Sequence, residues 1–169
     1  MKLLRTLTAS LVRIETVLLV VFLSLMGILA FAQVILRNVF GTGILWGDPM
    51  VRQMVLWSGF MGAALATSED RHISVDAFTK YLSAHTNQTI KIITSLAAAV
   101  VSLFLAQAAW EFVLAEKESG GEIFLGISSW VGLTIIPAGY MLITIHFLIQ
   151  AIEVAVKRFS RTPADTGRA

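Results

Sequence analysis

The chain has 169 residues, of which 56% are hydrophobic and 14% are charged, and its formal net charge is +2 at pH 7. With a mean hydropathy of +0.78, it is too apolar to be a soluble domain of this size. The composition indicates a single domain, residues 1–169, in a lipid bilayer, and it gives no basic surface for nucleic acid. The absence of cysteine excludes disulfides, thiolate metal sites and cysteine nucleophiles.

Four blocks of the sequence contain no Asp, Glu, Lys or Arg. A helix needs about 20 apolar residues to cross a bilayer, and three of the blocks reach or nearly reach that length. The sequence therefore predicts an all-α integral membrane protein with four transmembrane helices. The blocks are residues 16–36, 53–68, 92–110 and 123–152. With their flanks they predict helices at residues 14–39, 49–68, 91–112 and 129–153.

The second helix is predicted to begin before its uncharged block. Asp48 can cap it, Pro49 suits its first turn, and Arg52 lies four residues after Asp48. In the fourth helix, Pro137 is expected to cause a kink.

Basic residues predict the topology. They are more frequent in the two terminal flanks and in the segment after the second helix than in the other two connections, so both termini are expected in the cytoplasm. Trp46, Trp110 and Trp130 then fall at the outer boundary, where an aromatic belt is expected. Signal-peptidase cleavage after residues 30–32 is a weaker alternative, because the apolar run continues beyond them.

The connections carry amphipathic and acidic patterns. Residues 74–84 fit a helix lying in the plane of the membrane. The tail, residues 160–169, is polar and expected to be disordered. Glu116, Glu118 and Glu122 lie in the third connection, where they form either a docking surface for a basic partner or a solvated loop.

Two helices carry small residues at helical spacing. Gly59, Gly62 and Ala63 in the second helix are expected to allow close helix approach. A second small-residue face lies on the third helix at Ala98, Ser102, Ala106 and Ala109.

Few polar side chains are predicted at membrane depth. His146 is either part of a proton relay or a histidine bonded to a neighbour, and the second is favoured because no carboxylate is expected at its depth. Gln33 and Gln107 are expected to bond each other or a partner helix. His72 and Asp76 share a helix face but are too few for a metal site. No catalytic grouping is present, so no enzyme and no cofactor are expected.

One segment resembles a known family. Trp46-Gly47-Asp48, Arg52, residues 57–64 (WSGFMGAA) and residues 71–76 (RHISVD) are similar to motifs of the small membrane subunit of TRAP transporters, the tripartite ATP-independent periplasmic transporters. Two positions depart from that pattern. Pro49 replaces the second residue of an acidic pair, and Met61 replaces the usual leucine.

The resemblance implies a division of labour. A soluble periplasmic protein captures an organic acid, and a large inner-membrane subunit carries the solute and sodium sites. The small subunit packs against the large one as a fixed scaffold. Its outer interface is expected to be organised by Arg37, Trp46, Asp48 and Arg52, and its inner one by His72 and Asp76. Trp57 is a further candidate interface or structural residue.

Two other functions stay open from the sequence. One is a self-sufficient homo-oligomeric channel or proton-coupled carrier that uses His146. The other is an assembly or sensor protein unrelated to transport. Neither the transported solute, whether a C4-dicarboxylate, a sialic acid or another organic acid, nor the stoichiometry is encoded in a readable way.

Overall fold

The computed structural model describes residues 2–68 and 84–159. The tail at 160–169, nearly all of the predicted in-plane helix at 74–84, and the predicted site residues His72 and Asp76 lie outside the described residues. The described part is almost entirely helical, as the sequence predicts. Its elements are α1 (Lys2–Phe40), α2 (Gly47–Ser68), α4 (Ala84–Ser119), β1 (Glu122–Phe124), β2 (Ile127–Ser128), α5 (Ser129–Leu133) and α6 (Ile135–Phe159).

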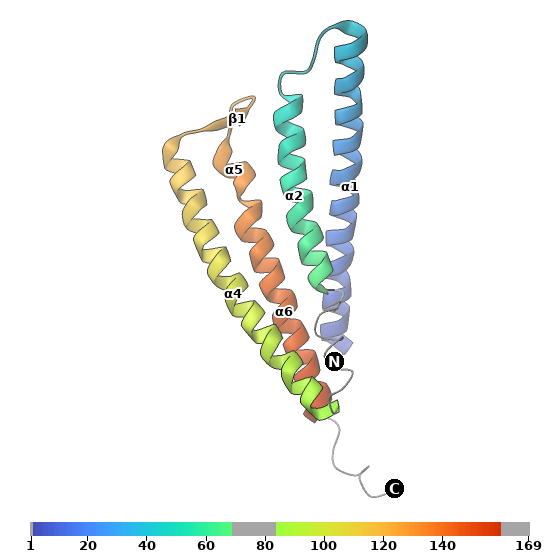
Figure 1. Ribbon diagram of the computed structural model, residues 1–169, viewed down its shortest axis with the longest axis vertical. Helices are drawn as coiled ribbons and strands as arrows, with labels where there is room; N and C mark the ends of the chain where they lie inside the picture. Colours follow the sequence, from blue (N-terminus) through green and yellow to red (C-terminus); the bar gives the residue numbers. More distant parts are fainter. Residues whose placement is uncertain (1, 69–83, 160–169) are drawn as a thin grey trace, which may run out of the picture.

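The long helices form a row in the order α4, α6, α2, α1 (Figure 1). Each packs mainly against its neighbours in that row: α4 on α6, α6 on α2, and α2 on α1. The protein therefore consists of two helical hairpins, α1–α2 and α4–α6, joined through α2 and α6. The loop between α1 and α2 and the β1–β2 hairpin lie at one end of the row, which we call the outer end. The start of α1 and the end of α6 lie at the other, the inner end.

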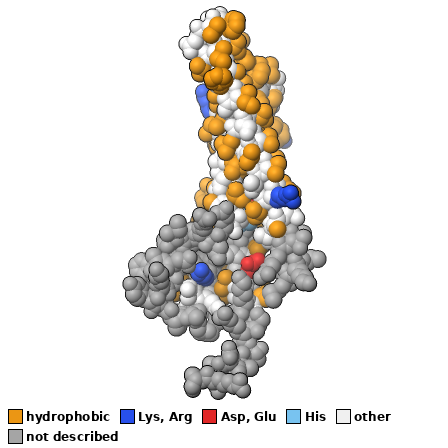
Figure 2. Space-filling model, turned by 90° about the vertical axis from the view of Figure 1, so that its right-hand side faces the viewer, with side chains coloured by type: hydrophobic (Ala, Val, Ile, Leu, Met, Phe, Trp, Pro, Cys, Tyr) orange, Lys and Arg blue, Asp and Glu red, His pale blue; other side chains and the backbone are white. Residues whose placement is uncertain are grey.

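Three described helical stretches are long and apolar enough to cross a membrane: Thr8–Phe40, Thr86–Ser119 and Ser129–Val156. The last includes α5 and α6, and it is the most buried of the three because α6 lies between two neighbours. The first has few buried residues. Figure 2, which faces the α1 side, shows hydrophobic side chains over most of the described surface. Such a surface requires a lipid or protein environment.

The fourth predicted helix is interrupted. α5 ends at Leu133, Thr134 separates the two helices, and α6 begins at Ile135. Pro137 explains the position of the break, because a proline has no N–H for the carbonyl of the fourth residue before it, and that residue is Leu133. The predicted disturbance by Pro137 is therefore present as a break rather than as a bend in a continuous helix.

A short β-hairpin precedes α5, where the sequence analysis expects no strand. Strands β1 and β2 are antiparallel, with Glu122 opposite Ser128. Leu125 and Gly126, at the turn, have positive φ angles of 50° and 76°, as tight hairpin turns require. Gly120, with φ of 70°, follows the end of α4 in the conformation typical of a residue that terminates a helix.

Candidate functional site

The first polar cluster lies at the outer end of the α1–α2 hairpin, and we call it the outer cluster. The Gln33 side chain forms two hydrogen bonds of 2.9 Å with the Ile44 backbone. Its amide nitrogen donates to the Ile44 carbonyl, and its amide oxygen accepts from the Ile44 N–H. Asp48 accepts hydrogen bonds from Arg37 and, at 3.3 Å, from Gln33. Gln33 is only 4% exposed. The cluster therefore fixes the loop between α1 and α2 against α1.

This geometry changes two expectations for Asp48. Helix α2 begins at Gly47, and the Trp46 carbonyl accepts a hydrogen bond from the Met50 N–H at 3.1 Å. Asp48 thus lies inside the first turn instead of preceding it. Within the described residues its ion-pair partner is Arg37 of α1 and not Arg52. The carboxylate links two helices, which the capping hypothesis did not predict.

The second polar contact joins the two hairpins. Trp57 of α2 donates its indole N–H to the Gly132 carbonyl at 2.9 Å, and the Gln53 amide donates to the same oxygen. Gly132 lies in α5, next to the break before α6. Trp57 also contacts Phe22 of α1, with ring centroids 5.4 Å apart. Trp57 therefore connects α1, α2 and α5.

Two glycines allow this close approach, and the sequence analysis did not single them out. A Cβ atom at Gly132 would lie 2.6 Å from the Gln53 side chain, and one at Gly139 would lie 2.6 Å from the Phe60 ring. Phe60 packs edge-on against Tyr140, with ring centroids 5.3 Å apart. No spacing motif marks these glycines, because each is defined by the neighbouring helix and not by its own.

The glycines that the sequence analysis did select face open space in this chain. A Cβ atom at Gly59 or Gly62 would meet nothing within 4 Å, and Ala63 is exposed. They do not mediate a helix contact within this chain. The small residues of the third predicted helix behave differently, since Ser102, Ala106 and Ala109 of α4 are buried.

The inner half of the protein contains a buried acid–base pair. His146 Nε2 of α6 lies 3.0 Å and 3.1 Å from the two carboxylate oxygens of Glu15 in α1. The side chains are 1% and 5% exposed. Two hydrogen-bond acceptors do not face each other without a proton, so one proton must lie between the imidazole and the carboxyl group. The pair connects the first and last long helices.

This pair confirms one expectation and corrects another. His146 is bonded to a neighbouring side chain, as favoured. The expectation that no carboxylate lies at its depth is wrong, because α1 begins at Lys2 and carries Glu15 well inside the helix. A small cavity of about 70 Å³ lies beside His146, lined partly by Thr8, Thr67 and Glu153.

The predicted docking carboxylates differ in their surroundings. Glu116 Oε1 accepts a hydrogen bond from the Ser129 hydroxyl at 2.7 Å, so it holds the end of α4 to the start of α5. Glu118 and Glu122 are exposed. Nearby, the Lys117 ammonium lies 5.3 Å from the centre of the Trp130 ring. Of the three carboxylates, Glu118 and Glu122 are thus exposed to a partner, whereas Glu116 is bonded to Ser129.

The polar contacts described above hold helices together, and none forms a ligand cage. Within residues 2–68 and 84–159, no group of three or more His, Cys, Asp or Glu side chains could hold a metal ion. Among residues 8–68, 86–123 and 125–156, whose side-chain burial is described, the buried ionisable side chains are Glu15 and His146, and each satisfies the other. The arrangement can fix the relative positions of the helices, whereas a route for a charged solute would need further polar groups at this depth.

Comparisons with known proteins agree with this picture. Residues 25–157 match the family model of the DctQ component of the tripartite ATP-independent periplasmic transporters. The chain is 32% identical over 88 residues to a TRAP transporter small permease protein of Haemophilus influenzae, covering 52% of this chain and 55% of the relative. The aligned part thus spans about half the length of that relative.

Two further relatives align over more of the chain. The C4-dicarboxylate TRAP transporter small permease protein of Vibrio cholerae is 23% identical over 88% of this chain and 74% of its own length. The ectoine TRAP transporter small permease protein of Halomonas elongata is 24% identical over 86% of this chain and 76% of its own length. DctQ-family proteins are transporter subunits and not enzymes. The chain belongs to the DctQ family of small membrane subunits of TRAP transporters.

Proposed function

We propose that this chain is the scaffold subunit of a sodium-coupled TRAP transporter in the bacterial inner membrane. It would stabilise a large membrane subunit that carries the solute and the sodium. A periplasmic protein would deliver an organic acid to that complex. The names of two relatives specify C4-dicarboxylate and ectoine, and an organic acid is the substrate class we propose here.

One observation carries the scaffold assignment. Glu15 and His146, two buried ionisable side chains, are bound to each other across two helices. A carrier keeps ionisable groups available to its solute or coupling ion at membrane depth. The pairing holds α1 to α6, which supports a structural role for both groups.

The scaffold proposal includes a four-span topology. Helix α2 has 22 residues and would be about 33 Å long, enough to cross the hydrocarbon layer. It contains Arg52 and Gln53, but these lie in its first turns near the outer boundary, close to Trp46. With α2 as the second span, the basic flanks favour cytoplasmic termini.

Reconstitution in liposomes tests the proposal. The large subunit, the periplasmic protein and a sodium gradient are supplied with or without this chain, and uptake of labelled organic acids is measured. We expect uptake only when this chain is present, and no flux through this chain alone. Flux of solute or protons through the chain by itself would contradict the scaffold assignment and favour a self-sufficient carrier that uses His146. A Glu15→Gln variant of that preparation would show whether the pair takes part.

A further inference from the structure

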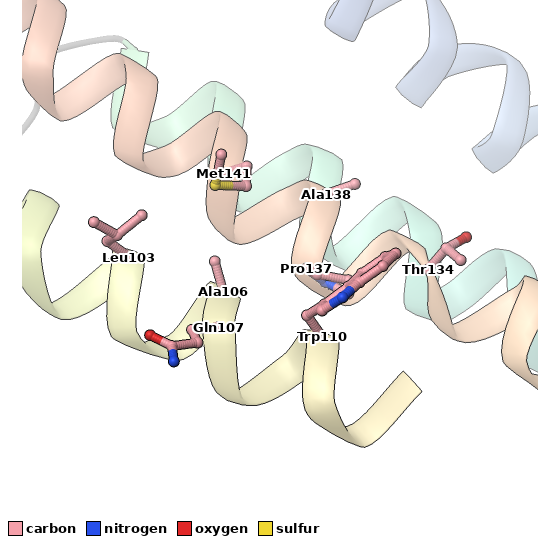
Figure 3. A pocket seen from close by; sticks show the side chains of 8 residues that line it. All are labelled: Leu103, Ala106, Gln107, Trp110, Thr134, Pro137, Ala138 and Met141. Atoms are coloured by element: carbon pink, nitrogen blue, oxygen red, sulfur yellow. The ribbon is translucent and has the colours of Figure 1, made fainter. Parts of the chain in front are cut away.

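A groove runs along the outer half of the α4–α6 hairpin. Its volume is about 670 Å³, within the range of ~300–1,000 Å³ usual for ligand sites. Figure 3 shows the Trp110 ring reaching from α4 toward the part of α6 that carries Pro137. The groove opens to the outside of the protein, because Leu103 and Trp110 are 51% and 53% exposed. The lining residues are Leu103, Ala106, Gln107, Trp110, Thr134, Pro137, Ala138 and Met141.

The position of the groove along α4 places it in one leaflet. The uncharged stretch of α4 ends at Trp110, directly before Glu111, and the outer edge of the hydrocarbon layer falls there. Leu103 lies seven residues earlier, about 10 Å deeper along the helix. The groove therefore lies in the outer leaflet, from the level of the ester groups downward.

Two polar side chains show what chemistry the occupant must have. The Gln107 amide forms no hydrogen bond within the described residues, and no other labelled side chain lies against it in Figure 3. An amide at this depth needs a partner. Lys117 lies seven residues after Trp110, so that Leu103, Trp110 and Lys117 occupy one stripe of α4. Lys117 is not a lining residue, and its ammonium lies 5.3 Å from the centre of the Trp130 ring, so it supplies a positive charge on α4 beyond the outer end of the groove.

We infer that this groove binds one glycerophospholipid of the outer leaflet. An acyl chain lies along Leu103 and Met141, an ester carbonyl accepts from the Gln107 amide, and the phosphate lies near Lys117. Long lysine side chains near a helix end reach the headgroup layer readily. The order of groups along α4, apolar then amide then cation, matches the order of groups in a phospholipid.

A second transmembrane helix fits the groove less well. Packed helices such as α4 and α6 have axes about 8–10 Å apart, whereas a helix with its side chains is about 10–12 Å wide. A partner helix would therefore lie over the groove and enter it only with side chains of one face. A flexible acyl chain can enter over the full length of the small-residue floor formed by Ala106, Pro137 and Ala138.

Native mass spectrometry of the purified full chain tests this inference. Delipidated protein is titrated with palmitoyl-oleoyl phosphatidylglycerol or with the diacylglycerol that has the same chains but no phosphate. The wild type should retain one phospholipid after the detergent is removed, and should retain the diacylglycerol less well. Lys117→Gln should abolish that difference. Gln107→Leu should weaken phospholipid binding by about threefold, the value of one hydrogen bond in a membrane.

A pair of matched variants separates the groove from the general helix surface. Ala138→Phe adds a ring to an exposed lining position, whereas Ala108→Phe adds the same ring to an exposed position of α4 outside the groove. We expect phospholipid affinity to fall about tenfold or more in the first variant and to stay unchanged in the second. Retention of detergent only, or equal retention by both variants, would overturn the inference. So would an Ala138→Phe protein that keeps its lipid but no longer binds the large subunit, since a partner helix would then occupy the groove.

Discussion

The Nε2 atom of His146 in α6 lies 3.0 Å and 3.1 Å from the two carboxylate oxygens of Glu15 in α1, and both side chains are buried. α1 otherwise packs mainly on α2. The pair therefore holds the inner half of the first helix to the last one, across the two hairpins.

Removing one member of this pair should destabilise the protein strongly. Glu15→Leu leaves the imidazole buried without a partner, at a cost of ~3 kcal/mol. The double variant Glu15→Leu/His146→Leu should be clearly more stable than the sum of the two single changes predicts, because neither group is then orphaned. Thermal unfolding in detergent measures all three. Ser24→Leu, an exposed change in the same helix, is the control, and strictly additive single effects would exclude energetic coupling of the pair.

Gly139→Ala should weaken the contact between the two hairpins. The new Cβ atom would lie 2.6 Å from the Phe60 ring, and the strain of such overpacking costs ~1–3 kcal/mol. Gly62→Ala is the matched control, because its Cβ atom would meet nothing within 4 Å in the same chain. Denaturant unfolding of both variants gives the comparison. Equal stabilities would show that Phe60 moves aside without cost.

In the outer cluster, the glutamine should matter more than the ion pair. Gln33→Ala removes a buried side chain with two hydrogen bonds to Ile44, which should lower stability by ~1–3 kcal/mol. Arg37→Gln should cost under ~1 kcal/mol, because the Arg37 and Asp48 side chains are 59% and 53% exposed. Hydrogen exchange of the Ile44 amide, whose N–H donates to Gln33, reports on the cluster directly. Exchange in Gln33→Ala that is as slow as in the wild type would contradict this account.

The open small residues of α2 should contribute to assembly. We expect Gly62→Leu to reduce co-purification of the large subunit and solute uptake, because the added side chain would separate the two surfaces. Its effect on the stability of the isolated chain should be small, since no neighbour within the chain is displaced. Gly27→Leu is the control for the added side-chain volume, because Gly27 of α1 is equally open. Unchanged co-purification and uptake would show that this face of α2 does not lie in the subunit interface.

Docking of the periplasmic protein should depend on two exposed carboxylates, Glu118 in the last turn of α4 and Glu122 in β1. The double variant Glu118→Gln/Glu122→Gln should slow association and reduce its dependence on salt, since charges at the edge of an interface act mainly on the association rate. Surface plasmon resonance of the complex at two salt concentrations measures this. Glu111→Gln, an exposed carboxylate eleven positions before Glu122, should leave the rate unchanged. An equal slowing in both would indicate a general charge effect.

The sequence analysis misplaced the depth of Glu15 for a specific reason. It predicted the first helix from residue 14 and the last one to residue 153, so that Glu15 stood at a helix start. In the structure α1 begins at Lys2 and α6 ends at Phe159. Glu15 then lies as many residues from the inner end of its helix as His146 does. Uncharged blocks mark the hydrocarbon layer, but helices continue beyond it, and that continuation decides which side chains meet.

The sequence pattern also could not predict which glycines are enclosed by a neighbouring element. Small residues spaced four apart predict a helix face that can pack closely, but they do not say against which helix. On α4 the predicted face is buried against α6, whereas Gly59 and Gly62 of α2 remain open. Gly132 and Gly139, which lie in no such pattern, are two of the positions where a residue of another element leaves no room for a side chain.

The sequence alone determined the class of this protein, its main helices and its family, because apolar length, charge-free blocks and local motifs are properties of each segment by itself. The tertiary structure alone decided that Asp48 joins Arg37, that Glu15 joins His146, and which glycines are enclosed. Those relationships depend on the rotation and depth of each helix relative to another. Rotation and depth are set by packing between segments that are distant in the chain, and a single sequence does not record them.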